Sequence, residues 1–185
     1  MLPIGTAERR FTLQAARRAL QEFLRDGVVS DCPTDAPCLL QHRGTFVTLR
    51  RRDSGQLRGC RGECRPLRPM IESVIRQAIS SATDDARFPS VTSEELPDLS
   101  IRISALSRLR PIEPEEIVLG KHGLLIVQGQ CSGLLLPEVP RLFGLKTRAQ
   151  FLIALFRKAK IPSEPGLQTD FQLYAFETEA WDDAE

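Results

Sequence analysis

Two arginines and two glycines surround Cys60 within six residues of the chain. The positive charges of Arg58 and Arg61 favour the thiolate form of a neighbouring cysteine, which is its nucleophilic form. Gly59 and Gly62 leave room for a ligand to approach the backbone, and backbone amides in such a turn can bind an anion. The segment therefore predicts a catalytic or ligand-lining cysteine, and it also fits a small buried side chain at the end of a strand.

A cysteine nucleophile requires a base, and the chain has 2 histidines. His122 precedes a predicted strand, where it could act as an acid, a base or a phosphate contact; the alternative is a solvated turn residue. His42 has no local partners that would assign it a role. Arg87 follows two aspartates at the predicted end of a helix, and it either braces the site or belongs to a loop that Phe88 holds in the core.

The spacing of the cysteines does not predict a metal site. Cys60 and Cys64 are separated by three residues, and Cys32 and Cys38 by five, whereas zinc modules use C-x2-C pairs. The sequence has no P-loop, no dinucleotide fingerprint, no H-E-x-x-H and no deaminase signature, so it indicates no particular cofactor. Aromatic residues make up 6% of the chain, which does not suggest a stacking platform for RNA.

The composition is that of a globular protein, with 42% hydrophobic and 26% charged residues among 185. The net charge of +1 gives no global attraction to nucleic acid or membrane. No apolar run approaches the ~20 residues of a membrane span, and five cysteines without an export signal indicate a reduced, cytoplasmic protein. Arginines are nevertheless concentrated in one region, where they form either an anion-binding patch or a solvated surface: Arg50, Arg51, Arg52, Arg58, Arg61, Arg65 and Arg68.

The elements that must position these residues begin with a helix over about residues 7–25, which Thr6 caps and Gly27 ends. Its apolar residues recur at helical spacing, and arginines occupy the other side. A hairpin follows, with strands at 46–50 and 56–60, then a helix over 70–82. Alternating apolar and polar residues at 99–105 predict a strand with one buried face.

The second half repeats this order of elements, with strands at 124–128 and 132–136, a helix and a last strand at 171–178. Thr147 and Gln150 form a capping box that opens this helix. Two strand–strand–helix–strand units, about 40–108 and 117–180, suggest an internal repeat within one domain of residues 1–185. Their strands would join into one curved, mostly antiparallel sheet with flanking helices and a smaller subdomain, an α+β fold.

Several motifs occur in the order found in one known family. They are Gly44–Leu49, Leu57–Cys60, Asp85–Pro89, Glu95–Pro97, Gly120–Gly123 and Ser132–Pro137. Over nearly its whole length the chain resembles the AMMECR domain family, which has no settled activity. The resemblance implies an α+β fold with an antiparallel sheet and a smaller subdomain, and a functional centre at the Leu-Arg-Gly-Cys segment. The internal repeat would place the Gly133 region at the hairpin end that corresponds to the Gly59–Cys60 turn, and Ser132 and Gly133 are predicted to bind ligand.

The resemblance also implies partners, because many such domains are encoded beside a Memo-like protein and a radical-SAM protein. A shared pathway that modifies RNA or a small molecule would follow. The chain departs from the family pattern at four positions: Arg61, Ala86, Cys131 and Glu138. Arg61 adds a charge beside the thiol where the family usually has an apolar residue.

Three hypotheses of function follow. In the first, a groove lined by Arg58, Gly59, Cys60 and His122 binds a small anionic or nucleotide-like ligand, as one component of a modification pathway. In the second, the chain is a non-catalytic protein-interaction module. In the third, it is a cysteine-dependent enzyme that uses Cys60 for acyl transfer or redox chemistry.

Overall fold

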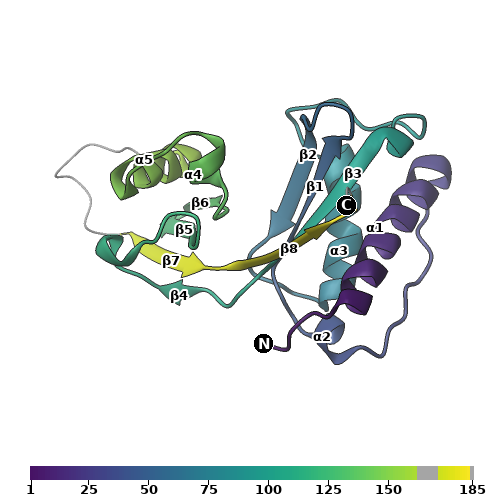
Figure 1. The fold of residues 1–185 in the computed structure, drawn as a ribbon, viewed down its shortest axis with the longest axis horizontal. Coiled ribbons are helices and arrows are strands. Elements are labelled where there is room, and N and C mark those ends of the chain that lie inside the picture. The colour runs from purple at the N-terminus through teal and green to yellow at the C-terminus, as the bar shows by residue number, and fades with distance from the viewer. Residues whose placement is uncertain (162–170, 184–185) are drawn as a thin grey trace. The chain divides into compact units, whose positions relative to one another are not determined.

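The computed structural model describes residues 1–161 and 171–183. The chain forms two compact units, one made of Met1–Leu106 with Glu179–Glu185 and the other of Ser107–Thr178 (Figure 1). Each unit combines helices with an antiparallel sheet, which confirms the predicted α+β class. The assignment of residues 1–185 to a single domain remains a prediction.

The first unit is built on a four-stranded sheet in the order β2-β1-β3-β8. Its strands are β1 (Thr45–Arg51), β2 (Leu57–Glu63), β3 (Leu99–Leu106) and β8 (Thr178–Asp182). Its helical segments are α1 (Thr6–Asp26), α2 (Pro37–Leu40), α3 (Met70–Thr83) and the short 3-10 turn η1 (Leu96–Asp98). Helices α1 and α3 pack side by side against one face of the sheet (Figure 1).

The alternation of side chains along the strands decides which face of this sheet is buried. Val47, Ile101 and Ile103 point toward the helices and are fully buried in a core shared with both of them. Thr48 lies opposite Arg102 in the register of β1 and β3, and both point to the other face. This second face is the one that α1 and α3 do not cover, and it carries the polar side chains.

Helix α1 ends as predicted, because Gly27 adopts the left-handed conformation with φ 72° and its N–H donates to the carbonyl of Phe23. The predicted cap at its other end is wrong. Thr6 is the first helical residue, the N-cap is Gly5, and no side chain caps the amides there. None of the helices in the described part of the chain is long and apolar enough to cross a membrane.

The second unit is built on a four-stranded sheet in the order β4-β7-β5-β6. Its strands are β4 (Arg110–Pro111), β5 (Gly123–Gln128), β6 (Cys131–Leu135) and β7 (Gln172–Phe176). Its helical segments are the 3-10 turn η2 (Pro114–Glu116), α4 (Val139–Leu142) and α5 (Arg148–Ala159). The predicted capping box of Thr147 and Gln150 opens α5, whose Phe151 and Leu155 fill the core against β5.

The strand–strand–helix–strand order occurs in both units, and the strands are arranged in the same way. The first three strands of each unit pair as β2-β1-β3 and β6-β5-β7. However, they form two sheets instead of the single joined sheet that the sequence suggested. Each unit pairs its own strands around its own core, and a fourth strand from outside the repeated order, β8 or β4, completes each sheet.

Candidate functional site

Cys60 lies on the face of the first sheet that the helices leave uncovered. It pairs with Thr48 across β1 and β2, and the Thr48 hydroxyl donates a hydrogen bond to the Cys60 sulfur over 3.3 Å. Hydrogen bonds donated to sulfur favour the thiolate over the thiol. The Cys60 side chain is partly exposed, so a ligand on this face can reach it.

Asp85 connects Cys60 to Arg87. Its Oδ2 accepts a hydrogen bond from the backbone N–H of Cys60 over 2.9 Å and another from Nη2 of Arg87 over 2.6 Å. Its Oδ1 accepts from Nε of Arg87 over 2.8 Å. The hydrogen bonds from Arg87 lower the pKa of Asp85 far below its usual range, with a smaller contribution from the Cys60 amide, although burial acts in the opposite direction. Asp85 is therefore ionised at neutral pH.

The guanidinium of Arg87 is held in place, yet it faces solvent. The side chain is 53% exposed, while Asp85 is 7% exposed. The ring of Phe88 lies 5.4 Å from the guanidinium carbon and restricts it further. The Asp85 hydrogen bonds raise the pKa of Arg87, and the nearby Cys60 adds to this effect. The structure thus places a fixed cation with an accessible edge beside Cys60, which brings these two predicted site residues together.

Arg58, by contrast, points into the protein and is 6% exposed. Its Nε and Nη2 donate to the two carboxylate oxygens of Glu95 over 3.1 and 2.9 Å, and its Nη1 donates to the carbonyl of Pro89 over 2.8 Å. These contacts tie β2 to the segment that precedes β3. They give Arg58 a structural role, and its role in ligand binding remains a prediction.

The two glycines of the segment lie where a larger residue would collide with its neighbours. A Cβ on Gly59 would lie 2.0 Å from the backbone carbonyl oxygen of Ser81 in α3, and one on Gly62 would lie 2.2 Å from the ring of Phe46. The backbone N–H of Arg61 donates to the Ser81 hydroxyl, as that of Cys60 does to Asp85. These two amides therefore already have acceptors, whereas the side chain of Arg61 is exposed.

His122 belongs to the second unit and is 3% exposed, so the alternative of a solvated turn residue is wrong. Its Nδ1 lies 3.2 Å from the backbone N–H of Val118, and its Nε2 lies 3.1 Å from Nη2 of Arg110. Burial lowers the pKa of His122, and the charges of Arg110 and Lys121 lower it further. A donor group thus faces each ring nitrogen. A neutral imidazole has one acceptor nitrogen and a protonated imidazole has none, so the protonated form of His122 is disfavoured here.

Ser132 and Gly133 also lie in the second unit, on β6. Ser132 is exposed, and Gly133 is buried where a Cβ would approach the Ala159 backbone nitrogen to 2.7 Å. The predicted site residues therefore fall into two groups, each described within its own unit. The first unit holds six of them, namely Arg58, Gly59, Cys60, Arg61, Gly62 and Arg87.

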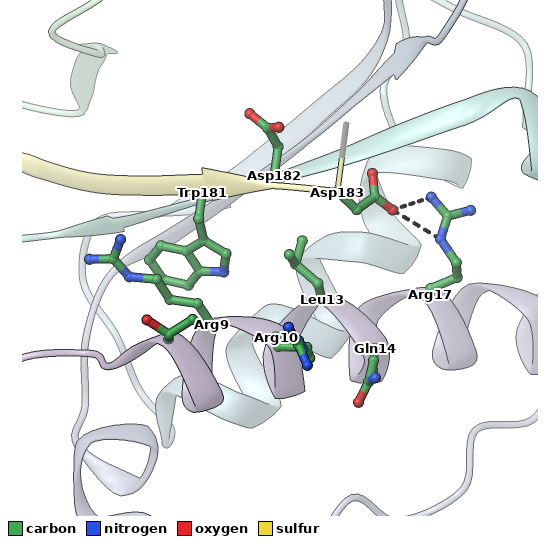
Figure 2. A pocket seen from close by; sticks show the side chains of 9 residues that line it. Arg9, Arg10, Leu13, Gln14, Arg17, Trp181, Asp182 and Asp183 are labelled. Carbon is green, nitrogen blue, oxygen red and sulfur yellow. Dashed lines mark hydrogen bonds and ion pairs between the residues drawn. The ribbon is translucent and has the colours of Figure 1, made fainter. Parts of the chain in front are cut away.

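The structure has a pocket that the sequence did not reveal (Figure 2). It has a volume of about 570 Å³ and lies between α1 and the end of β8 in the first unit. Arg9, Arg10 and Arg17 line it from α1, and Trp181 lines it from β8. The arginines were predicted to occupy the outer side of this helix, and the helical pattern contained no sign that the last strand packs beside them. The one signal in the sequence was the single tryptophan, Trp181, because a large aromatic residue in the last strand would be expected to pack against another element.

The cysteines give no further site. All five are free thiols, and burial raises the pKa of Cys38 and of Cys64. Among the described residues, no group of three or more His, Cys, Asp or Glu side chains is placed to hold a metal ion.

Comparisons with known proteins identify relatives over nearly the full chain. A protein of Thermococcus gammatolerans is 39% identical over 183 residues, which cover 94% of this chain and 89% of that protein. Protein TK0174 of Thermococcus kodakarensis is 38% identical with the same coverage. The crystal structure of uncharacterised protein PH0010 from Pyrococcus horikoshii is similar with a TM-score of 0.85 and 38% identity, over 93% of this chain and 89% of that one. The profile of the AMMECR1 family matches residues 13–181. The chain therefore belongs to the AMMECR1 family.

Proposed function

We propose that the chain binds a small anionic ligand, such as a phosphate-bearing or nucleotide-like molecule, at Arg87 beside Cys60. One observation carries the proposal: a single carboxylate, Asp85, accepts hydrogen bonds from both the Cys60 amide and the Arg87 guanidinium. A guanidinium held along one edge is preorganised to bind an anion with its other edge. The Nη1 group of Arg87 has no acceptor among the described residues, and it is the part that would contact the ligand.

Binding is better supported than catalysis at this site. A cysteine nucleophile needs a proton acceptor, and the strongly lowered pKa of Asp85 makes its carboxylate a poor one. His122, with its own lowered pKa, has its contacts in the second unit. The Thr48 hydroxyl that donates to the Cys60 sulfur supports thiolate character, and this keeps a cysteine-dependent enzyme as the second candidate function.

The biological setting of this proposal comes from the family resemblance. A Memo-like protein and a radical-SAM protein are the partners that we propose on that basis, with the chain as a cytoplasmic component of a modification pathway. The ligand would then be the substrate of that pathway or a phosphate-bearing part of it.

Protection of Cys60 from alkylation tests the proposal on the full chain. Native protein is treated with iodoacetamide, with or without inorganic phosphate at constant ionic strength, and the modified peptides are quantified by mass spectrometry. We expect phosphate to slow alkylation of Cys60 but not of the exposed Cys131. AMP is the second probe, because it adds a nucleoside to the same phosphate group.

Two arginine variants make the test specific. Arg87→Gln removes the proposed contact and should abolish the protection of Cys60. Arg76→Gln changes an exposed arginine on α3 of the same unit and should leave the protection intact. Equal protection in both variants, or no protection of the native protein by either probe, would contradict anion binding at Arg87.

A further inference from the structure

The pocket between α1 and β8 lies beside the edge of a sheet. In the strand order β2-β1-β3-β8, β8 is the last strand, so its outer edge has no partner strand in the described sheet. The backbone N–H of Asp183 donates to the carbonyl of Ile101, so this N–H points toward β3. Successive backbone N–H groups along a strand point to opposite sides, so the N–H and C=O of Ala180, three positions earlier, point to the outer edge of β8. An edge of this kind can pair with an added extended chain.

The other wall of the pocket is one face of α1. Leu13 provides an apolar contact, and Arg10 and Gln14 lie at the surface of the helix, where Figure 2 shows them below β8. The indole of Trp181 lies between the strand and the helix, where its Nε1 donates to the Thr12 hydroxyl over 3.1 Å. A helix beside an open strand edge is the arrangement by which extended peptides are bound through strand addition.

The charges of the pocket favour an acidic occupant. Asp183 is neutralised by Arg17 and Arg52, and Asp182 is paired with Arg102. Figure 2 shows the Asp182 side chain directed away from α1. Ion pairs thus balance the negative charges of the two aspartates that line the pocket, and the remaining arginines make the pocket positively charged.

Arg9 and Arg10 supply the positive charge that is left. The guanidinium carbon of Arg9 lies 5.5 Å from the centre of the Trp181 ring. Its Nη2 also lies 3.5 Å from an oxygen of Glu179, but solvent weakens this ion pair because both side chains are partly exposed. Arg10 is exposed and has no ion-pair partner among the described residues. A carboxylate that enters the pocket would find Arg10 directly available.

We infer that this groove binds an extended acidic peptide segment of a partner protein, which adds as a strand to the outer edge of β8. Backbone hydrogen bonds to Ala180 hold the peptide, and an acidic side chain on its α1 side pairs with Arg10. The pocket volume of about 570 Å³ lies within the range of established ligand sites. The groove is separate from the Cys60–Asp85–Arg87 contacts, so this inference does not depend on the proposed function.

The fluorescence of Trp181 reports occupation of the groove, because it is the only tryptophan of the chain. The full chain is titrated with a blocked hexapeptide of alternating valine and glutamate, and with the same peptide in which lysine replaces glutamate. We expect a saturable change in emission with the glutamate peptide and none with the lysine peptide. Equal responses to both peptides, or an equal response to free glutamate at the same carboxylate concentration, would overturn the inference.

Matched arginine variants locate the contact on α1. Arg10→Gln should raise the Kd of the glutamate peptide about threefold, because the lost ion pair is exposed to solvent. Arg18→Gln alters an arginine of the same helix that is 48% exposed and outside the pocket, and it should leave the Kd unchanged. An unchanged Kd in Arg10→Gln would contradict the assignment of this residue and with it the inference.

Strand addition itself is tested on the peptide, so that the protein remains unaltered. Two versions of the glutamate peptide are N-methylated at alternate residues, one in each register. The register that pairs with β8 should lose binding, whereas the other should retain it. If both versions bind as well as the parent peptide, the backbone is not used and the inferred mode is wrong.

Discussion

At the scale of single residues, the site is defined by what each charged group contacts. Arg58 and Arg87 both lie near Cys60. The guanidinium of Arg58 is fully engaged by Glu95 and the Pro89 carbonyl, whereas that of Arg87 keeps an exposed edge. Asp85 makes this difference, because it binds Arg87 on one edge only and anchors it to the Cys60 backbone.

Asp85→Asn should lower the free energy of unfolding by about 2 kcal/mol at neutral pH, since a charged hydrogen-bond acceptor is lost. A carboxylate with a lowered native pKa stabilises the fold above its unfolded pKa of about 4, and this contribution declines as the pH falls toward the native pKa. Urea unfolding should therefore show the difference between wild type and variant shrinking below about pH 4. Asp84→Asn, at an exposed neighbour, is the matched control and should change the free energy of unfolding little.

His122 also makes the protein less stable as the pH falls, but for a different physical reason and in a higher pH range. Its native pKa is lowered mainly by burial, so the unfolded chain binds a proton that the native protein does not. Stability should accordingly fall as the pH drops below the unfolded pKa of about 6.5. Thermal unfolding of His122→Gln should lack this slope between about pH 6.5 and 5, whereas His42→Gln, at an exposed histidine, should retain it. A slope that persists in His122→Gln would show that another group causes it.

At the scale of elements, a glycine at the same place in each unit allows a helix to approach a sheet. Gly59 in β2 faces α3, and Gly133 in β6 faces α5. Gly59 and Gly133 pair with Leu49 and Ile126, which lie on the corresponding first strands of the two units. This shared contact supports the repeated arrangement more strongly than residue identity between the halves does.

Substitution of these glycines by alanine should destabilise the protein through overpacking. Gly59→Ala and Gly133→Ala each place a Cβ against backbone atoms and should lower the free energy of unfolding by about 2 kcal/mol or more. Gly62→Ala meets the Phe46 ring, a side chain that can move, and should cost less. Chemical denaturation of the three variants tests this order, which would be refuted if Gly62→Ala were the most destabilised.

Local patterns in the sequence predicted most of the individual helices and strands. The strand at β3, the capping box of α5 and the end of α1 at Gly27 were predicted correctly, because each depends on residues within one element. The alternation of buried and polar positions in β3 holds only as far as Ile103, since Ser104 is buried as well. The contact of Asp85 with Cys60 joins residues 25 positions apart, and Arg58 meets Glu95 across 37 positions. No periodicity encodes such partners, so the sequence could suggest which residues carry chemistry but not which of them remain available.

At the scale of the whole molecule, the chain has two hydrophobic cores with no residue in common among the described ones. The first includes Leu20, Val74 and Ile101, and the second includes Phe151 and Leu155. The sequence suggested a single joined sheet because both halves show the same order of elements. The first three strands of each unit pair with one another, which hydrophobic patterns do not specify, and two sheets form instead.

Because the two cores are separate, we expect a cavity in one core to lower the local stability of its own unit more than that of the other. Phe151→Ala should lower the free energy of unfolding by about 4 kcal/mol and reduce amide-exchange protection chiefly in residues 107–161 and 171–178. Ile101→Ala should reduce protection chiefly in the first unit. Native-state hydrogen exchange by mass spectrometry distinguishes these outcomes, and a uniform loss of protection in both variants would indicate one cooperative unit.

The proposed anion site consists of the Arg87 guanidinium and its position beside Cys60. Its most direct test is an NMR titration of the full chain with inorganic phosphate, in which the side-chain Nε resonance of Arg87 and the backbone amide of Cys60 are followed together. We expect both resonances to shift saturably with one common Kd, and we expect Asp85→Asn to weaken this binding. Saturable shifts elsewhere in the chain, with these two resonances unmoved, would contradict it.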